Sequence, residues 1–195
     1  MHNLQSKSYR VSIANIAGHE DRFSLAVSGF EFAKCTIAVS SWSDANVSSE
    51  YLPGLVNWLK ERLGCHDVFC YAYNVGQTSQ ITKRADSVWR PISPAPVEDC
   101  PLALCDFRTV NREDLVPMDI VYPHFIDEAY EVKHNPSHRW FYKKGMTQED
   151  AIVFKLYDSL RSEATVCPHS AFVDPSAPLD TPRRASIEVK AIVLG

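Results

Sequence analysis

From Ser87 to its end, the sequence is a succession of short apolar runs separated by turns. The clearest run is 186–194, where apolar and polar residues alternate as they do along a strand with one buried face. So many short strands predict an α+β fold, mainly β, whose sheet curls into a jelly-roll-like barrel. We expect strands at 87–92, 102–107, 119–122, 128–133, 139–143 and 186–194. Residues 151–157 follow a T-x-x-D capping signature (147–150) and could form a helix or a strand; their apolar run favours a strand.

The first part of the chain adds strands and one helix. Residues 9–16 alternate as a strand does, and 23–32 suggest short strands or a turn around Gly29. Residues 50–63 predict a helix with leucines and a tryptophan on one face, and Gly64 is expected to end this helix. Residues 68–73 predict a buried strand, and the polar stretch 76–86 predicts a loop.

Length and composition are typical of a globular protein and exclude some classes of partner. The 195 residues predict a single domain (1–195), and the net charge of −4 without a basic cluster argues against nucleic acid. The first ten residues lack the apolar core of a signal peptide, and no run is long enough for a membrane span. We therefore expect a cytoplasmic protein whose six cysteines are reduced.

Several titratable residues are candidates for chemistry. His134 and His138 flank an Asn-Pro-Ser turn, and imidazole suits iron, zinc or acid–base work; each histidine could instead bond the turn backbone or face solvent. Asp158 ends an apolar run, either as a metal ligand or general base, or as the cap of the following turn. Lys155, inside that run, is expected to point outward. His169 lies in a proline-rich segment, as a functional group or as a surface residue.

The C-terminal arginines could bind a carboxylate. Arg183 and Arg184 precede the last strand, and a guanidinium can bind a carboxylate through two hydrogen bonds; the alternative is a solvated start to that strand. The chain contains none of the G-x-G-x-x-G, G-x-x-x-x-G-K-[ST] and G-x-S-x-G motifs, which leaves a kinase or a serine hydrolase without support.

The order of several motifs resembles a known family. The motifs are G-H-E-D-R-F-S-L (18–25), V-W-R-P-I (88–92), D-C-P-L-A-L-C-D (99–106), Y-E-V-K-H-N-P-S-H-R-W-F-Y (130–142), F-K-L-Y-D-S (154–159), P-H-S-A-F (168–172) and S-I-E-V-K (186–190). They are similar to hydroxylase/desaturase-like proteins of fungi and bacteria, related to the small component of cephamycin 7α-methoxylation. The resemblance covers nearly the whole chain and implies a double-stranded β-helix (jelly-roll or cupin-like) fold.

The resemblance also implies site residues. Several family members are non-haem iron enzymes that use 2-oxoglutarate in secondary metabolism. His169 then matches the distal iron ligand and Arg184 the 2-oxoglutarate clamp, while Lys190 stands where the family usually has another arginine. The chain departs from the family between Val68 and Val88, because the longer family segment there supplies a His-x-Asp ligand pair that is missing here.

Three hypotheses follow from this departure. The first is a tailoring enzyme without a cofactor that isomerises, cyclises or dehydrates a hydrophobic small molecule. The second is an Fe(II)/2-oxoglutarate oxygenase with a rebuilt triad of His138, Asp158 and His169. The third is a non-catalytic binding or partner protein. A barrel that lacks a segment also exposes an edge that a second copy could cover, as a homodimer.

We assign the following roles for the first hypothesis. The catalytic candidates are His138, Asp158, His169 and Tyr142, which could supply acid–base groups. The substrate-binding candidates are Trp89, Trp140, Phe172, Arg184 and Lys190.

Overall fold

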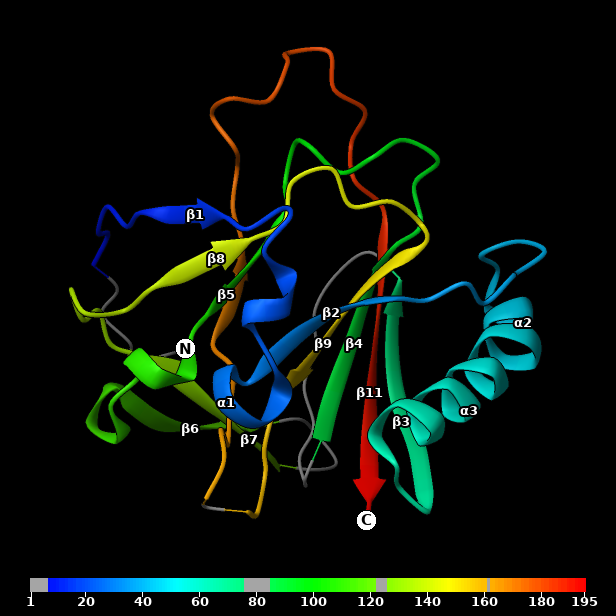
Figure 1. Cartoon of the computed structure of the whole chain (residues 1–195), viewed down its shortest axis with the longest axis horizontal. Helices are drawn as coiled ribbons and strands as arrows, with labels where there is room; N and C mark the ends of the chain where they lie inside the picture. Colours follow the sequence, from blue (N-terminus) through cyan, green and yellow to red (C-terminus); the bar gives the residue numbers. More distant parts are fainter. Residues whose placement is uncertain (1–6, 76–84, 122–125, 161) are drawn as a thin grey trace.

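The computed structural model describes residues 7–75, 85–121, 126–160 and 162–195, and its core is built from two facing sheets (Figure 1). The five-stranded sheet has the order β2 (Phe30–Lys34), β9 (Asp150–Lys155), β4 (Ala85–Pro91), β11 (Ser186–Leu194) and β3 (Asp67–Val75). The four-stranded sheet has the order β1 (Ile13–Asn15), β8 (Trp140–Tyr142), β5 (Leu102–Cys105) and β10 (His169–Ala171). The expected fold class, mainly β with few helices, is confirmed.

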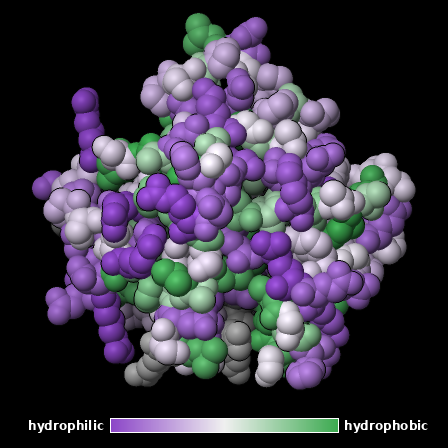
Figure 2. Space-filling model, in the orientation of Figure 1, coloured by the Kyte–Doolittle hydropathy of each residue, from purple (hydrophilic) through white to green (hydrophobic). Residues whose placement is uncertain are grey.

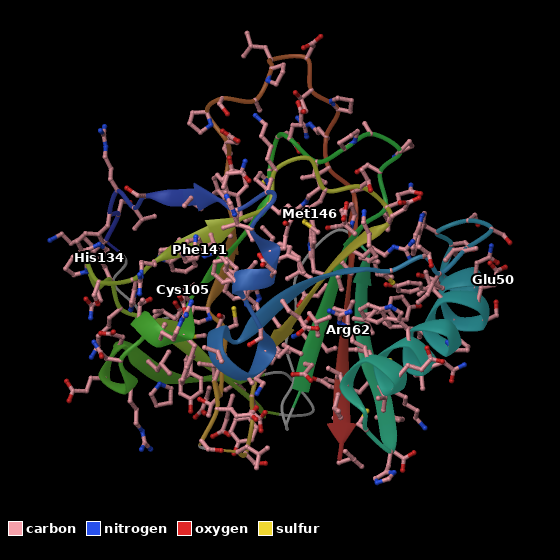
Figure 3. The ribbon with its side chains drawn as sticks, in the orientation of Figure 1. Glu50, Arg62, Cys105, His134, Phe141 and Met146 are labelled. Atoms are coloured by element: carbon pink, nitrogen blue, oxygen red, sulfur yellow. The ribbon has the colours of Figure 1, made fainter. Side chains whose placement is uncertain are left out.

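One face of the five-stranded sheet packs against helix α3 (Leu52–Leu63). Leu55 and Leu59 of the helix are fully buried against Val88, Val153 and other residues of this sheet. The helix ends at Gly64, whose left-handed backbone (φ 62°) closes it as the sequence predicts. Glu50 and Arg62 lie on this helical side of the molecule in Figure 3.

The opposite face of the five-stranded sheet meets the four-stranded sheet in a second apolar cluster. Trp89, Ile152 and Phe154 of the first sheet contact Leu102 and Leu104 of the second. Because side chains alternate along a strand, this packing fixes which residues of each strand face the barrel interior. In β4 the side chains at odd positions, such as Trp89, point inward, and in β9 those at even positions, such as Phe154, do so. The alternate side chains, such as Val88 and Val153, point toward α3.

The path of the chain between the sheets has one irregular step. From β4 onward the chain visits the four-stranded sheet for β5 and β8, returns for β9, crosses again for β10 and returns for β11. In contrast, β3 and β4 both belong to the five-stranded sheet, on either side of β11, and only residues 76–84 join them. Among the described strands, β10 is the last strand of its sheet on the side opposite β1.

The remaining elements are short and peripheral. β6 (Leu115–Val121) and β7 (Ile126–Val132) form a separate hairpin, and a π-helical turn (Val47–Tyr51) joins α2 (Asp44–Asn46) to α3. α1 (Leu25–Ser28) precedes β2. Short 3₁₀ turns are η1 (Glu20–Arg22), η3 (Phe107–Thr109) and η4 (Arg112–Asp114).

Most expected strands are present, but three expectations differ from the structure. The strand expected at 9–16 is limited to β1, and β3 is not buried throughout, because Phe69 is 64% exposed. Lys155 is buried, contrary to expectation, because Asp158 (2.7 Å) and Glu163 (3.0 Å) neutralise its ammonium group. Residues 76–84 of the expected loop lie outside the described residues.

The surface and the cysteines agree with the sequence. Figure 2 shows hydrophilic residues over most of one face, with hydrophobic residues in small separate groups. All six cysteines are free thiols, as expected. Within the ranges that the structure describes, no helix is long and apolar enough to span a bilayer.

Candidate functional site

His169 begins β10 and points into the barrel. It is paired with Leu104 of β5, whose side chain faces the interior, and its ring lies 4.4 Å from that of Phe154. Its Nδ1 is 2.9 Å from the carbonyl oxygen of Cys167. Since a carbonyl only accepts, Nδ1 carries the proton in this hydrogen bond, and Nε2 is the ring nitrogen that is left for another partner.

Two polar side chains that sequence reasoning did not select, Ser87 and Glu188, lie in the same interior, beside the expected Lys190. Ser87 of β4 is paired with Phe154, and its hydroxyl donates to the Glu188 carboxylate across the strands at 2.7 Å. Lys190 is paired with Ser87 and is 5% exposed. The alternation S-x-W in β4 and E-x-K in β11 is the sequence signal that could have found them.

Trp89 and Arg184 form the next layer of this interior. The Trp89 side chain is 3% exposed, and the Arg184 guanidinium lies 5.4 Å from its ring centroid, in cation–π range. Nη1 of Arg184 also donates to the carbonyl oxygen of Cys100 at 2.7 Å. The structure therefore brings His169, Lys190, Trp89 and Arg184 into one interior.

His138 lies elsewhere, in a polar cluster outside the barrel. Its Nε2 is 3.0 Å from the carboxylate of Asp114, and its side chain is only 4% exposed. Asn135 donates to the same carboxylate. These hydrogen bonds, together with the backbone N–H of Asn111, lower the pKa of Asp114 against the effect of desolvation. This arrangement anchors the loop before β8 and gives His138 a structural partner.

Asp158 follows β9 and is occupied by other contacts. It pairs with Lys155 at 2.7 Å and accepts the backbone N–H of Leu160 at 2.8 Å. Its side chain is 2% exposed. The alternative in which Asp158 caps the following turn therefore describes its local geometry.

Tyr142, Trp140 and Phe172 do not line the barrel interior. Phe141 of β8 is paired with Leu104 and packs in the interior cluster, so Trp140 and Tyr142 take the other face of the sheet. The ring of Tyr142 meets that of Phe172 edge-on at 5.0 Å, and its hydroxyl donates to Asp174 at 3.3 Å. Desolvation and the Asp174 carboxylate raise the pKa of Tyr142. The structure thus places these three candidates apart from His169, because alternation along the strands turns them to the other face of the sheet.

The described residues do not fit a facial iron site. Within them, no group of three or more histidine, cysteine, aspartate or glutamate residues is placed to hold a metal ion. His138, Asp158 and His169, all described, thus do not form the rebuilt triad, and that expectation is wrong. Cys105 and Cys167 add no thiolate, because burial raises the pKa of Cys105 to about 11 and that of Cys167 well above its usual value.

Relatives of this chain include fungal oxygenases. It is 25% identical to the hydroxylase/desaturase efuI of Hormonema carpetanum over 247 aligned positions, which cover 94% of this chain and 82% of efuI. It is 34% identical to the Fe(II)/2-oxoglutarate-dependent dioxygenase nvfI of Aspergillus novofumigatus over 57% of this chain and 41% of nvfI. Since 247 positions exceed the length of this chain, efuI carries residues inside the aligned region that have no counterpart here.

A solved structure shows the same fold. A variant of the iron and alpha-ketoglutarate-dependent endoperoxidase NvfI superposes with a TM-score of 0.87 at 25% identity, over 95% of this chain and 85% of NvfI. The cupin-like fold of the chain is thereby confirmed.

A family profile also matches this chain. It is described as YDMC, an oxidoreductase/YMDC permease-like domain, and it matches in two parts, residues 1–87 and 82–194. Because these two parts span nearly all of the sequence, the chain belongs to this family.

Proposed function

We propose that this chain is a tailoring enzyme of fungal secondary metabolism that has lost the iron centre of its relatives. It acts on a hydrophobic small molecule in the barrel, by a non-redox reaction such as isomerisation, cyclisation or dehydration. The observation that carries this proposal is His169, whose hydrogen bond to Cys167 leaves Nε2 toward the interior, while no group of three metal-ligating side chains is found among the described residues.

Three observations support the loss of a segment between β3 and β4. These two successive strands lie in the same sheet without being neighbours. From β4 on, each successive strand of the two sheets either changes sheet or pairs with the strand before it. The family profile breaks into two matches that meet at 82–87, and efuI carries extra residues inside its alignment. Residues 76–84 contain no histidine, cysteine, aspartate or glutamate, so this connection supplies no ligand of the His-x-Asp type.

The residues of the interior suggest how a substrate would be handled. Phe154 and Trp89 provide apolar walls, and the Arg184 and Lys190 cations stabilise negative charge that develops on the substrate. His169 removes a proton from the substrate through Nε2, and the hydrogen bond that its Nδ1–H donates to the Cys167 carbonyl orients the ring. The Ser87–Glu188 pair is a second polar group in reach of the same space.

The test begins with metal analysis and anaerobic titration of the purified protein with Fe(II) and 2-oxoglutarate. We expect no stoichiometric iron and no iron-dependent binding of 2-oxoglutarate. The protein is then incubated without oxygen and with EDTA in a metabolite extract of a fungal producer. We expect a compound to be converted to an isomer or a dehydrated product, detected by mass spectrometry.

Two variants assign the role of His169 in that conversion. His169→Gln should slow it by about 10²–10⁴-fold, the usual contribution of a general base. His66→Gln, at an exposed histidine beside β3, should leave the rate unchanged. Equal rates for wild type and His169→Gln would contradict the assignment.

An iron oxygenase is the second candidate, and one observation favours it. Metal-binding histidines typically donate their other ring N–H to a carbonyl or carboxylate, as His169 does. Stoichiometric Fe(II) with oxygen-dependent conversion would establish this alternative over the non-redox reaction. Absence of both iron and any conversion would favour the third candidate, a non-catalytic binding protein.

A further inference from the structure

A pocket of about 220 Å³ lies apart from His169, on the side of the barrel where β1 and β8 pair. It is bounded by η1 and by the residues around η3 and the start of β8. Three arginines and a histidine gather around two aromatic rings; the residues are His19, Arg22, Phe23, Arg108, Arg139 and Phe141. His169 is not part of its lining.

One of the three arginines is already paired. Asp106, whose side chain is 1% exposed, binds Arg108 through two hydrogen bonds, from Nε at 2.9 Å and from Nη2 at 2.8 Å. Hydrogen bonding to Asp106 raises the pKa of Arg108. The buried carboxylate therefore holds this guanidinium in place and cancels its charge.

The other two arginines carry uncompensated charge. The guanidinium groups of Arg22 and Arg139 form no ion pair and no hydrogen bond with any residue that the structure describes. Both residues are exposed and line the same pocket, so an anion bound there would be attracted by both charges. The chain as a whole has a net charge of −4, so this concentration of positive charge is local.

The floor of the pocket is apolar. The rings of Phe23 and Phe141 pack 4.8 Å apart, and Phe23 stacks on the fully buried Phe30 at 5.0 Å. Phe141 is labelled in Figure 3. A volume of about 220 Å³ is below the roughly 300–1,000 Å³ of most ligand pockets. The pocket therefore suits a small ligand, or one end of a larger ligand.

We propose that this pocket binds an organic anion, with a carboxylate between Arg22 and Arg139 and an apolar body on Phe23 and Phe141. Guanidinium groups match a carboxylate in shape and charge, and the aromatic floor favours a carbon skeleton over a bare inorganic ion. The proposal stands apart from the chemistry of His169, because the packed rings of Phe23 and Phe30 lie between the pocket and Phe154, on which His169 rests.

The test is calorimetric titration of the full chain with matched probes. Phenylacetate carries a carboxylate on an apolar ring, phenylacetamide is its neutral counterpart, and inorganic phosphate is an anion without an apolar body. We expect phenylacetate to bind more tightly than either of the other two. Arg22→Gln and Arg139→Gln should each weaken its binding by about three- to tenfold.

Arg112→Gln is the matched control. Arg112 is an exposed arginine in η4 that does not line the pocket, and its substitution changes the net charge by the same amount. We expect an unchanged affinity for phenylacetate. Equal loss in all three variants, equal binding of phenylacetate and phenylacetamide, tighter binding of phosphate, or no binding of phenylacetate would each overturn the proposal.

Discussion

Asp150 shows how one carboxylate fixes a strand end. It accepts the backbone N–H and the hydroxyl of Thr147 at 2.9 and 3.1 Å, and Lys34 and Lys143 pair with its other oxygen. Burial alone would raise the pKa of Asp150, but the Thr147 hydrogen bond and the two lysines lower it to about 2. The T-x-x-D signature thus closes the turn before β9 rather than beginning a helix.

The substitution Asp150→Asn should lower the free energy of unfolding by about 1–3 kcal/mol at neutral pH, because it breaks charge-assisted hydrogen bonds. A carboxylate with a lowered pKa stabilises the fold above its unfolded value of 3.8, and this contribution is lost as the pH falls through about 2. Urea unfolding should therefore show that the free energies of unfolding of wild type and Asp150→Asn approach each other as the pH is lowered through this range.

Glu149→Gln is the control for this pH dependence. Glu149 is the exposed neighbour of Asp150, and its side chain has no ion pair with the described residues. We expect little change in stability at any pH. A difference between Asp150→Asn and wild type that stays constant down to acid pH would contradict the role of the ionised carboxylate.

At the scale of elements, Gly29 joins α1 to β2 and lies close to the backbone of Val166, in the segment that leads to His169. Its φ of 81° is left-handed, and a Cβ added there would lie 2.7 Å from the carbonyl oxygen of Val166. Gly29→Ala should therefore cost about 2–4 kcal/mol, from backbone strain and from the forced shift of Val166. Thermal or urea unfolding measures this loss.

Gly145→Ala separates the two causes. Gly145 has a similar φ of 70°, but an added Cβ would meet nothing within 4 Å. The free energy of unfolding of this variant should fall only by the cost of the left-handed conformation, about 1 kcal/mol. Equal losses in the two variants would mean that Val166 moves aside without cost.

At the scale of the whole molecule, the proposed loss of a segment between β3 and β4 can be tested by restoring that segment. Replacing residues 76–84 with the segment that joins the equivalent strands of NvfI should create Fe(II) binding, because the resemblance places the other two iron ligands there and His169 is already inside the barrel. Anaerobic titration measures this gain. A glycine–serine insert of equal length is the control. A folded graft that binds no more iron than the unmodified chain would contradict the prediction.

The elements differ in how far the sequence predicts them. β11 has the expected bounds, 186–194, because its alternation reports two different environments along its whole length. β10 was missed, since its three residues follow a proline and pair with β5, more than sixty residues away in the chain. Lys155 was placed on the wrong side, because a periodic pattern does not reveal the carboxylates that neutralise a buried cation.

The site residues also differ in how far the sequence predicts their positions. The resemblance selected His169, Arg184 and Lys190, and the structure places these residues, with Trp89, in the barrel interior. The other candidates, His138, Asp158, Tyr142, Trp140 and Phe172, lie in separate clusters. Their residue types suit chemistry, but their hydrogen bonds and ring contacts serve local structure.

The amino-acid sequence predicts the fold class, the main strands, the helix that ends at Gly64 and the residues that could act as acids, bases or clamps. Local propensity and alternation carry this information, because each depends on neighbours along the chain. The packing of distant segments reveals which of those residues meet, that no three metal ligands converge among the described residues, and that Arg22, Arg108 and Arg139 share one pocket. Convergence depends on strand pairing between distant segments, which no local pattern encodes.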